Sequence, residues 1–402
     1  MVTQHGENER KAEFMTMFSR AKAGAVVIAL ALIALLGIAC TQDSVAPQHP
    51  ELTIDLRWIK SYPRETKSRV ETGLLWTLSY LGARWPNDAD GAMKWRRNVV
   101  TVDLATAGIA ANTKPAWKKL LAVLKGSDEY KATGAIDIGR FVALTLCSSH
   151  HYYALTGANE NYEDFRSRYR FEPKNSAIIE SIIAKGHRLV DVGAGRNFGG
   201  IAFVAYEGTG SIPGGSFQKQ EIEVLDFMEN GQLRFALYGL DGKLKPSAAS
   251  ALTAAGKPGK CLWCHELTLM KTFNHVTDVP GYFSSREFDN IIDSRMAEIR
   301  RYRNQLDSLL DFDKTQDHTF AELLYLAFLE PSLQRLANEW NVPAPQAERM
   351  LRGKSTHPHH ELPLLGSRLY RREEVDGLGP YATIAVPADA REPSPYEPDL
   401  LR

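Results

Sequence analysis

One five-residue stretch of this chain combines residue types that can hold a cofactor. It reads Cys261-Leu262-Trp263-Cys264-His265, so that two thiols stand three positions apart and an imidazole directly follows the second. Two thiols at this spacing form thioether bonds to the two vinyl groups of a haem, and the adjacent imidazole reaches the iron from the proximal side. The spacing therefore predicts one covalent haem c, held by Cys261 and Cys264, with His265 as the ligand of the haem iron.

The same pair of cysteines has two other interpretations. Cys261 and Cys264 would also suit a redox-active dithiol, or a zinc site completed by His265 or His275. A thioredoxin-like pair is expected at the end of a strand within a βαβ unit. Here the motif follows a segment of small residues, glycine, proline and lysine, KLKPSAASALTAAGKPGK. This approach favours haem attachment over a redox dithiol.

The N-terminal region has the pattern of an export signal. Arg20 and Lys22 precede an apolar run over residues 23–36, which is shorter than the roughly 20 residues of a membrane-spanning helix. The run ends in Leu36-Gly37-Ile38-Ala39-Cys40, which resembles the lipobox of bacterial lipoproteins, although Gly37 replaces the usual branched apolar residue. We therefore expect a protein exported to the periplasm or outer surface of a bacterium, with a lipid anchor on Cys40 that attaches it to the membrane.

Composition narrows the class of protein further. Of the four cysteines in 402 residues, only Cys147 is left if Cys40 carries lipid and the motif carries haem. No disulfide framework is then available, so an ordinary hydrophobic core must stabilise the two or three domains that this length allows. Lysine plus arginine equals aspartate plus glutamate at 48 each, which argues against a nucleic-acid partner.

The spacing of apolar residues predicts an α+β protein that is mainly helical. Helical periodicity covers residues 66–81, 115–125 and 136–155, and returns over 287–310, 320–330 and 345–353. Between these groups, short strands are expected at 203–206, 221–228 and 233–240, with Asn230-Gly231 as a hairpin turn. The glycines of 193–195 are expected in a turn, because too few residues follow them for the helix that a nucleotide-binding loop requires.

These elements suggest six divisions of the chain. They are a signal peptide with a lipobox-like end (1–40), a tether (41–51), a helical N-terminal domain (52–170), a small antiparallel sheet region (171–250), the haem-attachment motif with the helices that follow it (251–352), and a largely irregular tail (353–402).

The sixth ligand of the haem iron is not set by any spacing. Met270 and His275 follow His265 too closely to reach the opposite face of the haem. We expect the sixth position to be open, or to be closed by a side chain from another element. The candidates are Met228, His150, His151, Met296 and His318. The three imidazoles of His357, His359 and His360 lie in a proline-containing loop without a partner at a diagnostic spacing.

The motif over residues 259–265 resembles that of the c-type cytochromes. The resemblance implies a carrier of single electrons between redox partner proteins, with small-molecule redox activity if the iron is open. Unlike small soluble cytochromes c, this chain has its motif far from the N-terminus. A fainter similarity is to periplasmic cytochromes in which a small antiparallel sheet precedes the motif and a lysine is crosslinked to the haem. That similarity implies Lys219, Lys243 or Lys245 as the crosslinking residue.

Overall fold

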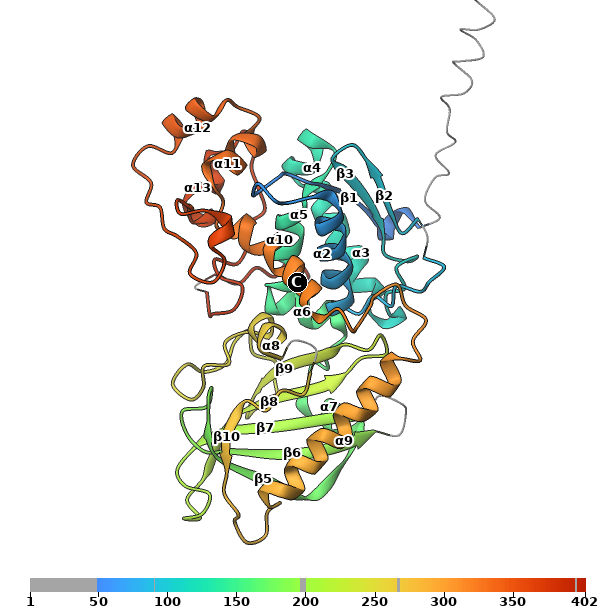
Figure 1. The fold of residues 1–402 in the computed structure, drawn as a ribbon, viewed down its shortest axis with the longest axis vertical. Coiled ribbons are helices and arrows are strands. Elements are labelled where there is room, and N and C mark those ends of the chain that lie inside the picture. Colours follow the sequence, from blue (N-terminus) through green and yellow to red (C-terminus); the bar gives the residue numbers. More distant parts are fainter. Residues whose placement is uncertain (1–48, 90, 196–199, 266–267, 395) are drawn as a thin grey trace, which may run out of the picture. The chain divides into compact units, whose positions relative to one another are not determined.

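The computed structural model describes residues 49–89, 91–195, 200–265, 268–394 and 396–402 (Figure 1). The strands in these ranges are β1 (Thr53–Arg57), β2 (Met93–Arg96), β3 (Val99–Asp103), β4 (Ile136–Asp137), β5 (Tyr169–Ser181), β6 (Arg188–Gly195), β7 (Ile201–Thr209), β8 (Gln218–Phe227), β9 (Leu233–Gly239) and β10 (Phe273–Val276). The α-helices are α2 (Lys67–Tyr80), α3 (Lys114–Gly126), α4 (Asp128–Thr133), α5 (Ile138–Leu146), α6 (Ser149–Thr156), α7 (Tyr162–Ser167), α8 (Pro258–His265), α9 (Ser285–Arg303), α10 (Thr319–Leu329), α11 (Leu333–Trp340), α12 (Ala344–Met350) and α13 (Arg372–Val375). Short 3-10 helices are η1 (Pro50–Leu52), η2 (Ala111–Thr113), η3 (Thr315–His318), η4 (Pro363–Leu365) and η5 (Asp376–Leu378). None of the helices in these ranges is long and apolar enough to cross a membrane.

The expectation of a mainly helical protein is wrong. The fold is α+β with 37% helix and 22% strand, and the region expected to be a helical N-terminal domain contains a four-stranded sheet. Its strand order is β2-β3-β1-β4, with β1 antiparallel to β3 and parallel to β4. These strands are at most five residues long, too short for their alternation to outweigh the strong helical periodicity of the segments around them.

The helix expected over residues 136–155 is interrupted twice. Residues 136 and 137 pair with β1 as strand β4, and the Asp137 carboxylate then caps α5 by accepting a hydrogen bond from the Gly139 amide at 2.8 Å. Cys147 and Ser148 separate α5 from α6, where the Ser148 side chain is the N-cap. Cys147 therefore lies between the two helices, whereas His151 is on α6.

The second sheet is larger than the small sheet expected. It has six strands in the order β10-β5-β6-β7-β8-β9, and every neighbouring pair is antiparallel. Strand β6 continues through Gly193 and Gly195, which were expected in a turn. The Asn230-Gly231 turn joins β8 to β9, with Gly231 at a φ of +87°. The Asn230 amide donates to the carbonyls of Ser79 and Ala83 at 2.7 and 2.9 Å, and so fixes this turn to the end of α2.

Helices cover both faces of the six-stranded sheet. Figure 1 shows α9 lying across one face, with α8 beside the β9 end, while α7 lies behind the strands. Helix α10 follows the motif in sequence but packs against α2 and α5 in the N-terminal region. Gly73 on α2 and Gly139 on α5 permit this close packing, because a Cβ at either position would overlap with α10. The region after the motif is therefore part of the same core as the N-terminal helices.

A buried network of arginines and carboxylates joins the C-terminal region to α5. The guanidinium groups of Arg140, Arg335 and Arg372 surround the ring of Phe328, at 5.0, 5.2 and 4.0 Å from its centroid. Each guanidinium also binds a carboxylate, as the following contacts show. Arg335 contacts both oxygens of Asp137 at 2.9 Å, Arg372 contacts both oxygens of Glu339 at 2.9 Å, and Arg140 contacts Asp376 at 2.7 and 3.0 Å.

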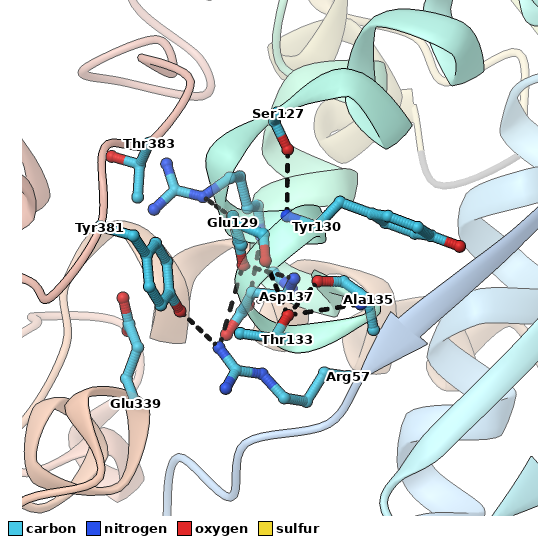
Figure 2. A network of polar contacts seen from close by, with 12 residues as sticks. Arg57, Ser127, Glu129, Tyr130, Thr133, Ala135, Asp137, Glu339, Tyr381 and Thr383 are labelled. Carbon is cyan, nitrogen blue, oxygen red and sulfur yellow. Dashed lines mark hydrogen bonds and ion pairs between the residues drawn. The ribbon is translucent and has the colours of Figure 1, made fainter.

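Figure 2 shows further contacts of this network around Arg57, Glu129 and Tyr381. Arg57 donates to the Tyr381 hydroxyl at 2.8 Å and lies 4.0 Å from the Glu129 carboxylate. Glu129 also forms an ion pair with Arg140 at 2.8 Å, and a buried charge requires such a partner. Arg335 and Arg372 both bind Glu339, and their charges hold the pKa of its carboxyl well below the usual range, at about 2, despite burial.

Replacing Glu339 tests the energetic weight of this network. Glu339→Gln leaves two buried guanidinium groups without their shared carboxylate, so we expect a loss of about 3–5 kcal/mol in the free energy of unfolding, measured with denaturant. Lys131→Gln, which removes an exposed ion pair with Asp128, should change stability by less than about 1 kcal/mol. Equal, small effects of both substitutions would mean that the network does not stabilise the fold.

Candidate functional site

The residues of the C-x-x-C-H motif form the last two turns of α8. Pro258 stands at the first turn of this helix, where the missing N–H costs nothing, and Gly256 before it has a φ of +65°. Cys261 and Cys264 are not joined in a disulfide, and both are partly buried. One short helix thus presents both thiols and the imidazole of His265 to the same side.

That side of α8 lines an apolar cavity of about 140 Å3. This volume is smaller than the range of about 300–1,000 Å3 that is typical of cofactor and ligand pockets. Residues of the sheet and of α8 and α9 form its walls. The lining side chains include Val190, Phe203, Ala205, Phe235, Leu237 and Phe273 from the sheet, and Cys261, Cys264, His265, Phe288 and Ile292 from the helices.

The alternation of side chains along the strands explains the apolar wall. Register places Val190, Ala205 and Leu237 in one row across β6, β7 and β9, and Phe203, Leu225 and Phe235 in the next. Residues two apart on a strand share a face, so both rows point towards the cavity. The large flat surface that results can cover one face of a planar macrocycle.

The imidazole of His265 has the hydrogen bond that an iron ligand needs. Its Nδ1 lies 3.1 Å from the carbonyl oxygen of Thr268, and its ring lies against Phe235 with 5.1 Å between centroids. A proton on Nδ1 donated to this carbonyl leaves Nε2 unprotonated, which is the tautomer that binds a metal. Burial lowers the pKa of His265 to about 4, and the charge of Arg188 acts in the same direction. The ring is therefore neutral at pH 7.

The Cys261 thiol does not have the environment of a reactive dithiol. Burial raises the pKa of the Cys261 thiol, and the charge of Glu223 raises it further. A redox-active cysteine requires the opposite, a thiolate stabilised by nearby positive charge. Across the described ranges, no group of three or more His, Cys, Asp or Glu side chains is placed to hold a metal ion. Two cysteines followed directly by a histidine are the donor set that covalent haem attachment uses, and the raised pKa of Cys261 argues against a reactive dithiol.

The C-terminal tail fixes the outer side of α8. Lys257 donates through its amide to the Arg391 carbonyl at 2.9 Å, and through its ammonium group to the Asp389 carbonyl at 2.7 Å and Glu397 at 3.2 Å. The Arg391 guanidinium lies over the Trp263 ring at 4.0 Å from its centroid. The tail therefore has few helices and yet holds the motif in place by contacts on both sides of Trp263.

None of the five expected sixth ligands lines the described part of the cavity wall. His151 is occupied at both nitrogens, by the Leu144 carbonyl at 2.7 Å and the Leu400 amide at 2.8 Å. Met296 accepts a hydrogen bond from the Leu269 amide. The other three lie elsewhere: His150 is near Asp399, His318 is buried beside Glu322, and Met228 is in the turn after β8. Met270, which the spacing argued against, does line the cavity and is 45% exposed.

The proposed crosslinking lysines are also outside the cavity lining. Lys219 lies over the Tyr206 ring at 3.4 Å from its centroid, on the face of the sheet opposite the cavity. Lys245 binds Glu221, and Lys243 is exposed. Lys260 on α8 is the lysine that lines the cavity, and it pairs with Glu392.

Two further sets of residues lie apart from the cavity. His357 contacts Glu330 at 3.0 Å, and His359 accepts from the Leu362 amide, so these imidazoles serve local structure. His360 is exposed. The lipidation site expected at Cys40 lies outside the described residues.

Sequence reasoning missed the charged residues of the cavity wall. Arg188 and Glu223 line the cavity, and Glu207 lies behind them. One signal in the sequence could have found them, because each stands two residues from an apolar residue of the same strand that lines the cavity: Val190, Ala205 and Leu225. Without the register between strands, the three charged residues could not be placed together.

A pH series tests the state of His265 in the haem-free protein. Because its pKa is near 4 when folded and near 6.5 when unfolded, only the unfolded state takes up this proton between these values, and stability falls as pH falls. The loss should reach at most about 3 kcal/mol. We expect His265→Gln to remove this part of the acid destabilisation, whereas the exposed His275→Gln should retain it. An unchanged profile in His265→Gln would contradict a buried, neutral imidazole.

Comparison with protein-family models, with curated proteins and with solved structures gave no match for this chain. The interpretation of the cavity therefore depends on its own residues. These are two thiols and a neutral imidazole, arranged on one helix against an apolar sheet.

Proposed function

We propose that the protein is an exported c-type cytochrome that transfers single electrons. One haem would be held in the apolar cavity by thioether bonds from Cys261 and Cys264, with His265 as the proximal ligand of iron. The hydrogen bond from His265 Nδ1 to the Thr268 carbonyl carries this proposal, because it leaves Nε2 for the metal on the same helix as both thiols.

The chain's own residues have three tasks in this function. Thr268 and Phe235 fix the orientation of the His265 ring. The apolar rows of the sheet keep water from the haem, which supplies the one-electron redox chemistry. The C-terminal tail holds α8 against the cavity, so that the distance between motif and sheet stays constant as electrons enter and leave. Redox proteins outside the cell membrane would be the donor and acceptor.

Covalent haem is the first test. The protein should be expressed with cytochrome c assembly factors and denatured in SDS, and haem peroxidase activity should remain with the polypeptide band. Cys261→Ser and Cys264→Ser should each weaken or abolish this retention, whereas Cys147→Ser, on α5's C-terminal side, should retain it. A colourless wild-type protein would reject the proposal.

Carbon monoxide tests the sixth position of the iron. Since none of the expected ligands from other elements lines the described wall, we expect carbon monoxide to bind the reduced protein and shift its Soret band. An open iron would also permit small-molecule redox chemistry. An unchanged spectrum would indicate a strong sixth ligand, and Met270→Ala would then identify it by restoring carbon monoxide binding.

Export and lipidation are part of the same proposal and have a separate test. Mass spectrometry of the mature protein should find a lipidated Cys40 as the first residue, with membrane attachment that Cys40→Ala abolishes. An N-terminal peptide that begins before residue 40 would contradict lipidation at this position and would leave the haem assignment unaffected.

A further inference from the structure

Four charged residues interrupt the apolar wall of the cavity at one end of the sheet. Register places Arg188, Glu207 and Glu221 in one row across β6, β7 and β8, directly beside the row that contains Glu223. All of these side chains belong to the cavity face, because they alternate with residues of the opposite face. Charges at such positions cost free energy unless each one is paired.

This cluster has more carboxylates than cations. Arg188 donates from Nε to the Glu207 carboxylate and from Nη2 to Glu223 Oε2 at 2.8 Å. The side chains of Arg188, Glu207 and Glu223 are only 8%, 1% and 15% exposed. One guanidinium thus faces two carboxylates in a site that water hardly reaches. Three ionised groups would leave one uncompensated negative charge.

The charged groups around the cluster do not correct this imbalance. Glu221 is already bound by the Lys245 ammonium group and by the Ala249 amide. Lys260 on α8 is bound by Glu392. From the loop before α8, the hydroxyl of Thr253 lies near Glu223 and lowers its pKa without adding charge. On α8 itself, the groups nearest the cluster are the Cys261 thiol and the neutral His265 ring.

The two carboxyls respond to this excess of negative charge. Burial raises the pKa of Glu207 to about 7, against the opposing effect of Arg188, and the charge of Glu223 raises it further. Burial also raises the pKa of Glu223. Two acids that share one cation titrate as a pair, so the pair as a whole exchanges a proton near neutral pH.

We propose that Arg188, Glu207 and Glu223 form a proton-binding site in the haem cavity, through which the protein takes up one proton when it accepts an electron. This inference depends on the proposed haem function. A one-electron donor protein supplies the electron, and water supplies the proton that converts one carboxylate to a carboxylic acid. The net charge of the cavity is then the same before and after reduction.

The position of the cluster gives the coupling its physical basis. Glu223 and Cys261 are close enough for their charges to interact, so the cluster adjoins the haem edge that Cys261 would hold. An added electron in a medium of low polarity repels the excess carboxylate more strongly than it would in water. A proton on that carboxylate removes the repulsion, and reduction therefore becomes easier as pH falls.

The midpoint potential of the haem-loaded protein, measured by mediator titration between pH 5 and 9, tests the proposal. We expect the potential to fall as pH rises around neutrality, by at most about 59 mV per pH unit, which corresponds to a tenfold change for one electron. Glu207→Gln leaves Arg188 with a single carboxylate and should flatten the slope. Glu223→Gln should do the same, and provides a second variant if the first does not fold. The exposed Glu348→Gln on α12 should retain the wild-type slope.

A slope that is the same in wild type and in both variants would assign the proton to another group, such as a haem propionate, and would overturn the proposal. A wild-type potential independent of pH would overturn it as well. Infrared spectra of the haem-free protein separate this failure from failure of the haem assignment. A protonated carboxyl band that titrates near pH 7 and disappears in Glu207→Gln would support the proton site even if no haem were bound. Absence of that band in the haem-free wild type would contradict it.

Discussion

The packing of three arginines around one phenylalanine is the constraint on which the rest of this structure depends. Phe328 lies on α10, and its guanidinium neighbours come from α5, α11 and α13, so one aromatic ring joins segments more than 200 residues apart. Arg140 then donates to the Ile384 carbonyl at 2.7 Å, where the tail begins its path towards α8. Because each buried guanidinium group is paired with a carboxylate, the network fixes the orientation of these segments as well as the distances between them. Through the tail, it determines where the motif helix lies.

The cavity lies where helices cover the apolar face of the sheet only in part. A six-stranded antiparallel sheet with one apolar face must be covered, and α9 covers part of it while α8 covers the β9 end (Figure 1). Between these helices the wall is apolar but not filled by side chains, which natural cores rarely allow without a ligand. The motif's thiols and imidazole point into this space. This arrangement of an apolar space beside two thiols and an imidazole is the basis of the proposed haem site.

The two buried groups of charges in this protein differ in the ratio of carboxylates to arginines. Around Phe328, the contacts pair each arginine with a carboxylate, and the shared Glu339 has a strongly lowered pKa. In the cavity, Arg188 faces both Glu207 and Glu223, and the pKa values of both carboxyls are raised. A network in which positive and negative charges are equal in number contributes a fixed geometry. A network with an excess of carboxylates can exchange a proton at little cost in free energy. The first is suited to holding the fold and the second to responding to a change of charge nearby.

The sequence by itself predicted that Cys261, Cys264 and His265 lie on one side of a short segment, because their spacing is close to one helical turn, which is fixed locally. It also indicated the hairpin at Asn230-Gly231, since a turn depends on adjacent residues. The N-terminal sheet was missed, because its short strands have no local signal strong enough to compete with their helical neighbours. Only the tertiary structure decided which residues face the motif. The register of three strands brings Arg188 to Glu207 and Glu223, and the fold brings the tail to α8. Both depend on contacts between segments that are distant along the chain.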